Sequence, residues 1–541
     1  MKINHILTGI ALCGALCACS KLLDVPQNGS FGSQEEFYKT DANVLSGVAT
    51  IYNQWRSSYE QRMVLLTTLS DEVSKGGANI AFFPDWAQRN SFTYNAGDEV
   101  IGNYYKSLYT MVYYCNLITQ NVTPDTDVKK QCVAEAKFFW ANAYFDLVSL
   151  WGETVPFVDH LLSTEEYHVG RSEPGQNWTK MEEYLKDAIA VLPNKSSKTD
   201  KSQYRVTSDA AKVMLGKVYL WQKKYADAAK VLDEVIDDER YGLWGVDEPG
   251  EYDMLMHAVA NDCCEKVLDI RIPNDESNYE KNNLSGATMF LGYFYWSGRQ
   301  VSFSPAVSST FSTGDGYFPP RKTLYDRFVA EEGADGYRLK STMRTAVQLA
   351  EAGVNVSQGN LPENYGYFNW KNRGLKADLI AEKSGMGASH MVYTNNPVIR
   401  YAEVLLLAAE AHVMAGDDQT KADTYVNKVR QRAHLGDKTG VTLDDIKLEK
   451  NLELCFEGVR YMDIIRWGDA MDLMKDQGKE VVQLEVKKDP ATGAMSYNVT
   501  QLQSNPDAGF KDRNWLLPIP KSEMDVNGVE HGGNMTQNPG W

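Results

Sequence analysis

Most of the chain carries the hydrophobic pattern of amphipathic helices, in which apolar residues recur every three to four positions. The segments with this pattern are 41–60, 104–120, 131–150, 178–192, 209–222, 225–237, 400–415 and 421–433, and two more helices lie within 443–474. Ser208 is the expected N-cap of the helix at 209–222. The pattern therefore predicts a mainly α-helical protein.

The helices at 209–222 and 225–237 are expected to form an antiparallel hairpin. Leu215, Gly216, Tyr219, Ala228, Leu232 and Val235 fall at the spacing of a tetratricopeptide repeat. A small residue such as Gly216 lets two helices approach, while Leu232 fills the gap between them. Weaker copies of the pattern occur at 140–193 and 409–429. Helical hairpins of this type form arrays that usually serve as scaffolds or docking surfaces.

Between the helical parts lies a long segment, 241–396, with a different composition. It contains Gly, Ser, Asn and many aromatic residues, and only 324–328 and 345–352 have the pattern of short helices. The tail from Lys475 onward is expected to be turn-rich and extended. The chain is accordingly divided into a leader at 1–18, a helical region at 19–240, the irregular segment at 241–396, and a C-terminal helical region with its tail at 397–541.

The leader has the features of a secretory signal. Lys2 is followed by an apolar run from Ile6 to Ala18, which is too short to span a bilayer core of about 30 Å as a helix. The run ends in Leu16-Cys17-Ala18-Cys19, which resembles a bacterial lipobox. Cys19 is then the expected site of lipidation and the first mature residue. The alternative is a plain signal cleaved near Ala18. Lipidation predicts a protein anchored to a membrane that it does not cross.

The net charge argues against one class of partner, and the spacing of the cysteines argues against a zinc site. The formal net charge of −17 argues against nucleic acid as a partner, because phosphate binding requires a basic face. No spacing of cysteines matches a zinc motif. Cys115, Cys132 and Cys455 lie in apolar helical patterns and are interpreted as core residues. A disulfide between Cys115 and Cys132 remains an alternative.

The usual catalytic patterns do not occur in the sequence. It has no His-Glu-x-x-His zinc motif, no P-loop and no Gly-x-Ser-x-Gly elbow. Asp and Glu residues are abundant, but abundance alone does not indicate a glycosidase pair. His412 lies on an apolar helix face and is predicted to be a packed core residue. We therefore predict that the protein is not an enzyme and that it has no cofactor or metal centre.

Several segments together resemble the SusD/RagB family of outer-membrane lipoproteins of Bacteroidetes. The matching segments are 22–26, 114–116, 134–139, 144–152, 397–405, 453–468, 517–520 and 536–541, and they occur in the order of the family. The resemblance implies a surface-exposed, non-catalytic lipoprotein. Such a protein binds glycans, or in some members peptides, and passes them to a TonB-dependent transporter of the SusC type. The outer membrane is then the expected location.

One family segment also suggests a charged site. Glu457, Arg460, Asp463 and Arg466 are spaced by three residues, so on a single helix they would form pairs along one face. We interpret them as an ion-pair network that holds the helices together rather than as an acid–base or anion site.

A glycan site needs aromatic rings for the C–H faces of sugars and polar groups for their hydroxyls. Two regions of the sequence offer both kinds of residue. The candidates are Asp85 and Trp86 in the first region, and Tyr293, Tyr295, Trp296, Arg299, Tyr317, Phe318 and Trp370 in the second. The alternative is that these rings pack locally, for example in a strand that buries alternate residues.

These observations predict the capture of an oligosaccharide at the cell surface for delivery to a partner transporter. Three alternatives stay open: a peptide ligand, a purely structural lid of a transporter, and a polysaccharide hydrolase.

Overall fold

The computed structural model describes residues 34–541 except 78, 202–203, 273–295, 297–299 and 381–391. The predicted leader, the predicted lipidation residue Cys19, and the candidates Tyr293, Tyr295 and Arg299 lie outside the described residues.

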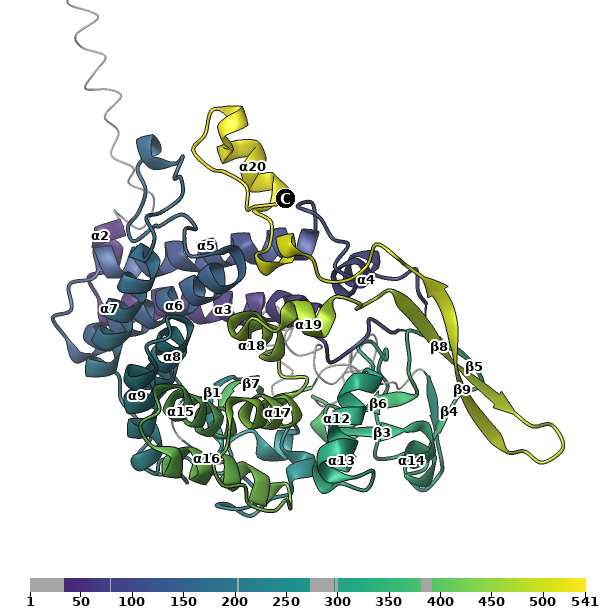
Figure 1. The fold of residues 1–541 in the computed structure, drawn as a ribbon. Helices are drawn as coiled ribbons and strands as arrows, with labels where there is room; N and C mark the ends of the chain where they lie inside the picture. The colour runs from purple at the N-terminus through teal and green to yellow at the C-terminus, as the bar shows by residue number, and fades with distance from the viewer. Residues whose placement is uncertain (1–33, 78, 202–203, 273–295, 297–299, 381–391) are drawn as a thin grey trace, which may run out of the picture.

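A layered array of long helices forms most of the fold (Figure 1). Its members are α3 (Asp41–Leu69), α5 (Glu99–Asn121), α6 (Asp127–Trp151), α7 (Gln176–Val191), α8 (Ser208–Trp221), α9 (Tyr225–Asp237), α15 (Tyr401–Ala415) and α16 (Gln419–Arg432). Each helix packs against the next one in this order, so α9 contacts α15 although the segment 238–400 separates them in sequence. The predicted mainly α-helical fold is confirmed.

The hairpin of α8 and α9 packs as its sequence predicts. A Cβ atom at Gly216 would lie 2.7 Å from Cγ of Leu232, so glycine is what allows this close approach. The cap differs by one residue from the prediction, because Thr207 accepts the hydrogen bond from the Ala210 backbone N–H. The Ser208 hydroxyl instead donates to the Ile189 carbonyl at 2.9 Å and ties α8 to α7.

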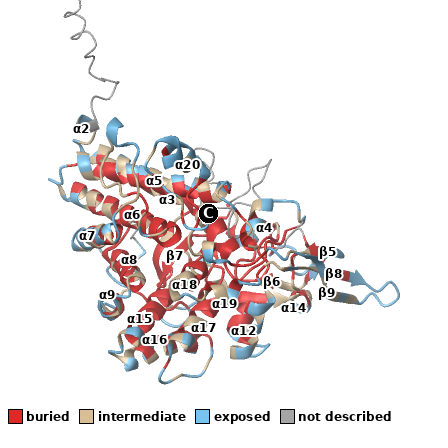
Figure 2. Cartoon of the chain, turned by 45° about the horizontal axis from the view of Figure 1, so that its top comes forward, coloured by how far each residue is buried: buried red, intermediate tan, exposed pale blue. Residues whose placement is uncertain are grey.

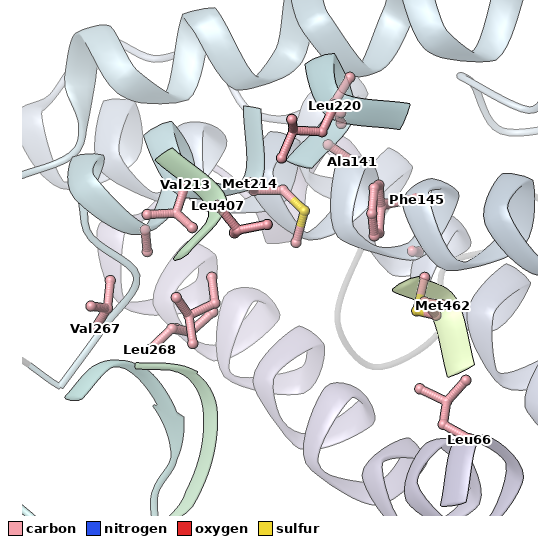
Figure 3. Packing of buried hydrophobic residues seen from close by; sticks show 14 of the residues in the cluster. Leu66, Ala141, Phe145, Val213, Met214, Leu220, Val267, Leu268, Leu407 and Met462 are labelled. Carbon is pink, nitrogen blue, oxygen red and sulfur yellow. The ribbon is translucent and has the colours of Figure 1, made fainter. Parts of the chain in front are cut away.

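The core lies between the layers of the helical array. Figure 3 shows Phe145 of α6, Met214 and Leu220 of α8, and Leu407 of α15 pointing into one shared space. Figure 2 shows the same distribution over the whole molecule, with buried residues on the inner faces of the helices and exposed residues on the outer helices and the projecting hairpin. Packing of apolar faces is therefore what holds the array together.

Short strands and helices make up the middle segment. Antiparallel pairs join β1 (Lys266–Ile270) to β7 (Asn396–Arg400), β2 (Val301–Phe303) to β4 (Val354–Val356), and β3 (Met343–Thr345) to β6 (Tyr367–Asn369). The helices are α12 (Lys322–Glu332), α13 (Tyr337–Thr342) and α14 (Ala346–Glu351). The two predicted short helices correspond to α12 and α14.

The C-terminal region adds further helices and a hairpin. Helices α17 (Leu443–Leu454), α18 (Arg460–Trp467) and α19 (Ala470–Met474) precede strands β8 (Glu480–Lys488) and β9 (Met495–Ser504). With β5 (Gly359–Pro362) these strands form an antiparallel sheet in the order β5-β8-β9. The hairpin of β8 and β9 projects from the body in Figure 1, and α20 (Lys521–Asn527) follows it in sequence.

Short elements complete the described structure. These are the helices α2 (Gln34–Phe37) and α4 (Pro84–Asn90), and 3-10 turns at Thr164–Glu166, Tyr252–Met254, Ala258–Ala260, Lys376–Asp378, Asp512–Trp515 and Val529–His531.

The predicted ion-pair network exists, but its geometry differs from the prediction. Helix α17 ends at Leu454 and α18 begins at Arg460, so Glu457 lies in the turn between them and not on one helix with the others. Phe456 and Gly458, with φ of 66° and 71°, break the helix there. Glu457 consequently pairs with Arg400 at 2.7 Å rather than with Arg460.

The remaining sequence predictions concern cysteines and His412. All five cysteines of the described residues are free and buried, so Cys115 and Cys132 form no disulfide. His412 is buried, with hydrogen bonds to Asp233 and Asp417, in agreement with the predicted core role.

Within the described part of the chain, no helix is long and apolar enough to cross a membrane, and no group of His, Cys, Asp or Glu side chains could hold a metal ion.

Candidate ligand-binding site

Helix α4 carries the first candidate region. Pro84 occupies its first turn, where a missing N–H costs no hydrogen bond. Arg89 near its end is fully buried, and its Nη1 lies 2.6 Å from Oδ1 of Asp98 at the N-cap of α5. This ion pair fixes α4 against the helical array and thereby fixes the rings that the helix carries.

Three aromatic rings stack face to face at the start of α4. The centroids of Phe83 and Trp86 are 4.3 Å apart with an interplanar angle of 14°, and those of Trp86 and Phe318 are 5.1 Å apart at 20°. The ring of Tyr317 meets Trp86 edge-on at 5.2 Å. The structure thus brings Trp86, Tyr317 and Phe318 together, although 230 residues separate them along the sequence. We call Phe83, Trp86, Tyr317 and Phe318 the ring stack.

Two members of the ring stack have strained backbones. Phe83 has φ of 50° and Phe318 has φ of 58°, a left-handed conformation that is an outlier for bulky residues. Backbone strain of this kind concentrates at functional sites. The strand-like contact of Gly76 with Tyr317 positions the second half of the stack, and a Cβ atom at Gly77 would lie 2.3 Å from the Tyr317 ring. The glycines therefore allow the close approach that sets the ring positions.

Only the outer end of the ring stack is open to solvent. Phe83 is 45% exposed, and its neighbour Phe82 is 54% exposed, whereas Trp86 is 7% exposed. The half-buried Asp85 and the exposed Gln88 are polar residues of the same short helix. A sugar ring could therefore stack on Phe82 or Phe83, while Trp86 supports Phe83 from behind. Our sequence reasoning missed both phenylalanines, although they directly precede Trp86.

Lys75 lies on the inner side of the ring stack. Its ammonium donates to the backbone carbonyls of Asn79 and Ile80 at 3.0 and 3.1 Å, and it lies 6.0 Å from the centroid of the Tyr317 ring. Burial lowers the pKa of Lys75, although the nearby Glu363 carboxylate acts in the opposite direction. The lysine thus holds the loop that carries Phe82.

The second candidate region forms a separate cluster. The fully buried Trp296 stacks on Phe311 at 5.7 Å and meets Trp370 edge-on at 6.2 Å. The Trp296 indole N–H donates to the Ser312 carbonyl at 2.9 Å, and that of Trp370 donates to Asp253 at the same distance. These rings are thus packed and hydrogen-bonded in the described structure.

A backbone contact links the two clusters. The amide of Gly316 donates to the Trp296 carbonyl at 2.7 Å, which places Trp296 beside the residue that precedes Tyr317. The two regions that the sequence marked as aromatic-rich are therefore neighbours in space.

Comparison with known sequences identifies two family matches. The sequence model of the SusD family matches residues 271–541. A second model, described as "Starch-binding associating with outer membrane", matches residues 27–220. A SusD-like protein of Bacteroides ovatus is 24% identical over 482 residues, which cover 85% of this chain and 82% of that protein. SusD-like protein P2 of Formosa agariphila is 23% identical and is matched over 99% of this chain and 100% of its own length.

Solved structures with the same fold include glycan-binding proteins. A structure titled "Laminarin binding SusD-like protein" has a TM-score of 0.74 and 26% identity, and the match covers 93% of this chain and all of that one. Surface glycan-binding protein A from Bacteroides thetaiotaomicron, in complex with laminarihexaose, has a TM-score of 0.70 and 22% identity over 92% of this chain and 100% of its own. At the latter identity the likeness concerns the fold alone.

Proposed function

The chain belongs to the SusD family, and from this premise we propose that it is a non-catalytic glycan-binding protein that captures an oligosaccharide. The observation that carries the proposal is a pair of exposed rings, Phe83 at the open end of the ring stack and Phe82 next to it in the chain. Phe82 and Phe83 offer apolar faces, and Asp85 and Gln88, which lie on the helix that begins directly after Phe83, carry hydrogen-bonding groups. This combination suits the two kinds of surface on a sugar.

The ring stack also favours a glycan over a peptide. A peptide site needs unpaired backbone groups or pockets for side chains, whereas flat exposed rings suit the C–H face of a pyranose. The solved structure of the laminarin-binding relative, which shares 26% identity, supports this ligand class.

The place of action proposed here is the outer membrane. The match to a family described as associating with the outer membrane supports this location. Cys19, at the end of a lipobox-like leader, would carry the lipid anchor. By analogy with the family, the bound glycan would pass to a SusC-like TonB-dependent transporter, and the protein would face the cell exterior.

The proposal is tested by titrating the full chain with a panel of oligosaccharides and analysing each mixture for hydrolysis products. We expect binding of at least one glycan and no products. Folded protein that binds no glycan of the panel would contradict the proposal, and release of shorter sugars would favour the hydrolase alternative.

The anchor and the partner have their own test. Labelled fatty acid should be incorporated into the wild-type protein and not into Cys19→Ser, and solubilised membranes should yield the transporter together with the wild-type protein. Equal labelling of both proteins would contradict lipidation at Cys19.

A further inference from the structure

A groove lined by tyrosines lies away from the ring stack. It has a volume of about 550 Å³, and its walls come from α5, from the loop after α6, and from α20. Figure 1 shows α20 above α5. The groove shares no residue with the ring stack or with the Trp296 cluster. We call it the tyrosine groove.

One face of α5 supplies most of the rings. Tyr105, Tyr109 and Tyr113 are spaced by four residues, so their side chains follow one another along the same side of the helix. Tyr105 is 4% exposed and Tyr113 is 47% exposed. Tyr167, from the loop after α6, stands at the opposite wall and is 61% exposed. Exposed rings therefore face a preformed hollow rather than a packed interface.

The buried end of the tyrosine groove carries two tyrosine hydroxyls. The hydroxyl of Tyr109 donates to the Pro156 carbonyl at 2.9 Å. Burial raises the pKa of Tyr105, and a hydrogen bond between the Tyr105 and Tyr109 hydroxyls acts in the opposite direction. The rings open to a ligand are therefore the exposed ones, Tyr113 and Tyr167.

The rim of the tyrosine groove is polar. The Asn527 amide donates to the Val169 carbonyl at 2.7 Å and to the Glu523 carboxylate at 3.1 Å, which ties α20 to the loop and orients that carboxylate. Lys106 and Thr110 of α5 also line the groove. Such a rim supplies acceptors and donors for several hydroxyls.

From these features we infer that the tyrosine groove is a second oligosaccharide-binding site. The volume falls within the range of small-ligand pockets. Tyrosine rings with a polar rim fit the alternating C–H faces and hydroxyls of a sugar chain. The inference takes its ligand class from the proposed function, but it concerns different residues. A second site would hold another part of the same chain and so increase the overall affinity for long glycans.

The double variant Tyr113→Ala/Tyr167→Ala removes the two exposed rings and should weaken binding at the groove about tenfold or more. Tyr204→Ala serves as the control, because Tyr204 is 68% exposed and does not line the groove. Calorimetric titration of the full chain with laminarihexaose, maltohexaose and cellohexaose measures the affinity and the number of sites for each protein.

We expect two sites per chain for at least one probe, with one site weakened by the double groove variant and the other by Phe83→Ala. A single site that is indifferent to the double groove variant overturns the inference and leaves the proposed function standing. Wild-type protein that binds none of the probes overturns the inference and counts against the proposed function. A groove that binds a partner protein and no sugar also overturns the inference.

Discussion

The guanidinium of Arg400 is buried among three carboxylates. It lies 2.8 Å from Glu265, 2.7 Å from Glu453 and 2.7 Å from Glu457. Burial raises the pKa of Glu453, but the guanidinium groups of Arg432 and Arg400 outweigh this effect and hold it far below its ordinary value. Burial also raises the pKa of Glu457, but the Arg400 guanidinium and Lys371 hold it below its ordinary value. Glu453 and Glu457 are therefore charged at neutral pH, and they depend on their cations for stability.

Replacing Arg400 by alanine should reduce the free energy of unfolding by about 3–5 kcal/mol, because it leaves buried carboxylates without their partner. Urea denaturation at pH 7 measures the change. Lys39→Ala is a matched control, since the pair of Lys39 with Glu36 is exposed and should contribute at most about 1 kcal/mol. Equal effects of the two substitutions would contradict the importance of the buried network.

His412 makes the stability depend on pH. Burial lowers its pKa, but hydrogen bonds to Asp233 and Asp417 raise it more, so the net pKa is above the ordinary value. A raised pKa means that the stabilisation is fully present below about pH 6.5 and is lost as the pH rises through the folded-state pKa. Lys421 and Tyr425 also contact Asp233, and both contacts remain when His412 is replaced by glutamine.

Between pH 6 and pH 9, the wild-type protein should therefore lose more of its unfolding free energy than His412→Gln, which cannot carry the charge. Thermal denaturation at several pH values measures both profiles. Parallel profiles would show that His412 does not titrate in this range.

At the scale of elements, helix packing explains how much of the fold the sequence predicts. Periodicity located the long helices, because amphipathic faces determine both the pattern and the packing. It also identified the close contact of α8 with α9 through Gly216 and Leu232. The sequence predicted the β8–β9 hairpin only as part of an extended tail. Strand β9 is mostly exposed, so its sequence carries little hydrophobic signal.

The variant Gly216→Ala tests the contact of α8 with α9. The new Cβ atom would overlap with Leu232, and such overpacking costs about 1–3 kcal/mol, partly offset by the higher helix propensity of alanine. Gly102→Ala in α5 is the control, because there the nearest atom is Cβ of Pro520 at 3.8 Å. It should stabilise the protein by up to about 1 kcal/mol. The denaturant midpoint of unfolding is measured for both variants. Stabilisation by both substitutions would contradict the close contact of α8 with α9 at Gly216.

The aromatic candidates show where sequence reasoning stops. Composition selected residues that lie together in the structure, because Trp86, Tyr317 and Phe318 meet in one stack. It could not distinguish exposed rings from supporting ones, since that depends on tertiary contacts between segments far apart in sequence. Phe83 is the open end of the ring stack, whereas the tryptophan chosen from the sequence lies behind it.

At the scale of the whole molecule, the helical array provides a rigid base and the ring stack is built on one part of it. The ion pair of Arg89 with Asp98 connects α4 to α5, and the contact of Gly76 with Tyr317 connects the loop before α4 to the middle segment. Rigid support reduces the ordering cost of binding. The position of Phe82 and Phe83 is therefore set by the fold as a whole.

The most direct test of the central claim is the affinity of the full chain for its best glycan, measured for the wild-type protein and for Phe82→Ala/Phe83→Ala. Tyr204→Ala is the control for loss of an exposed ring elsewhere. The account predicts that the double variant binds about tenfold more weakly or worse with an unchanged circular dichroism spectrum, while the control binds normally. Unchanged affinity of the folded double variant would contradict the claim that these two rings form the glycan platform.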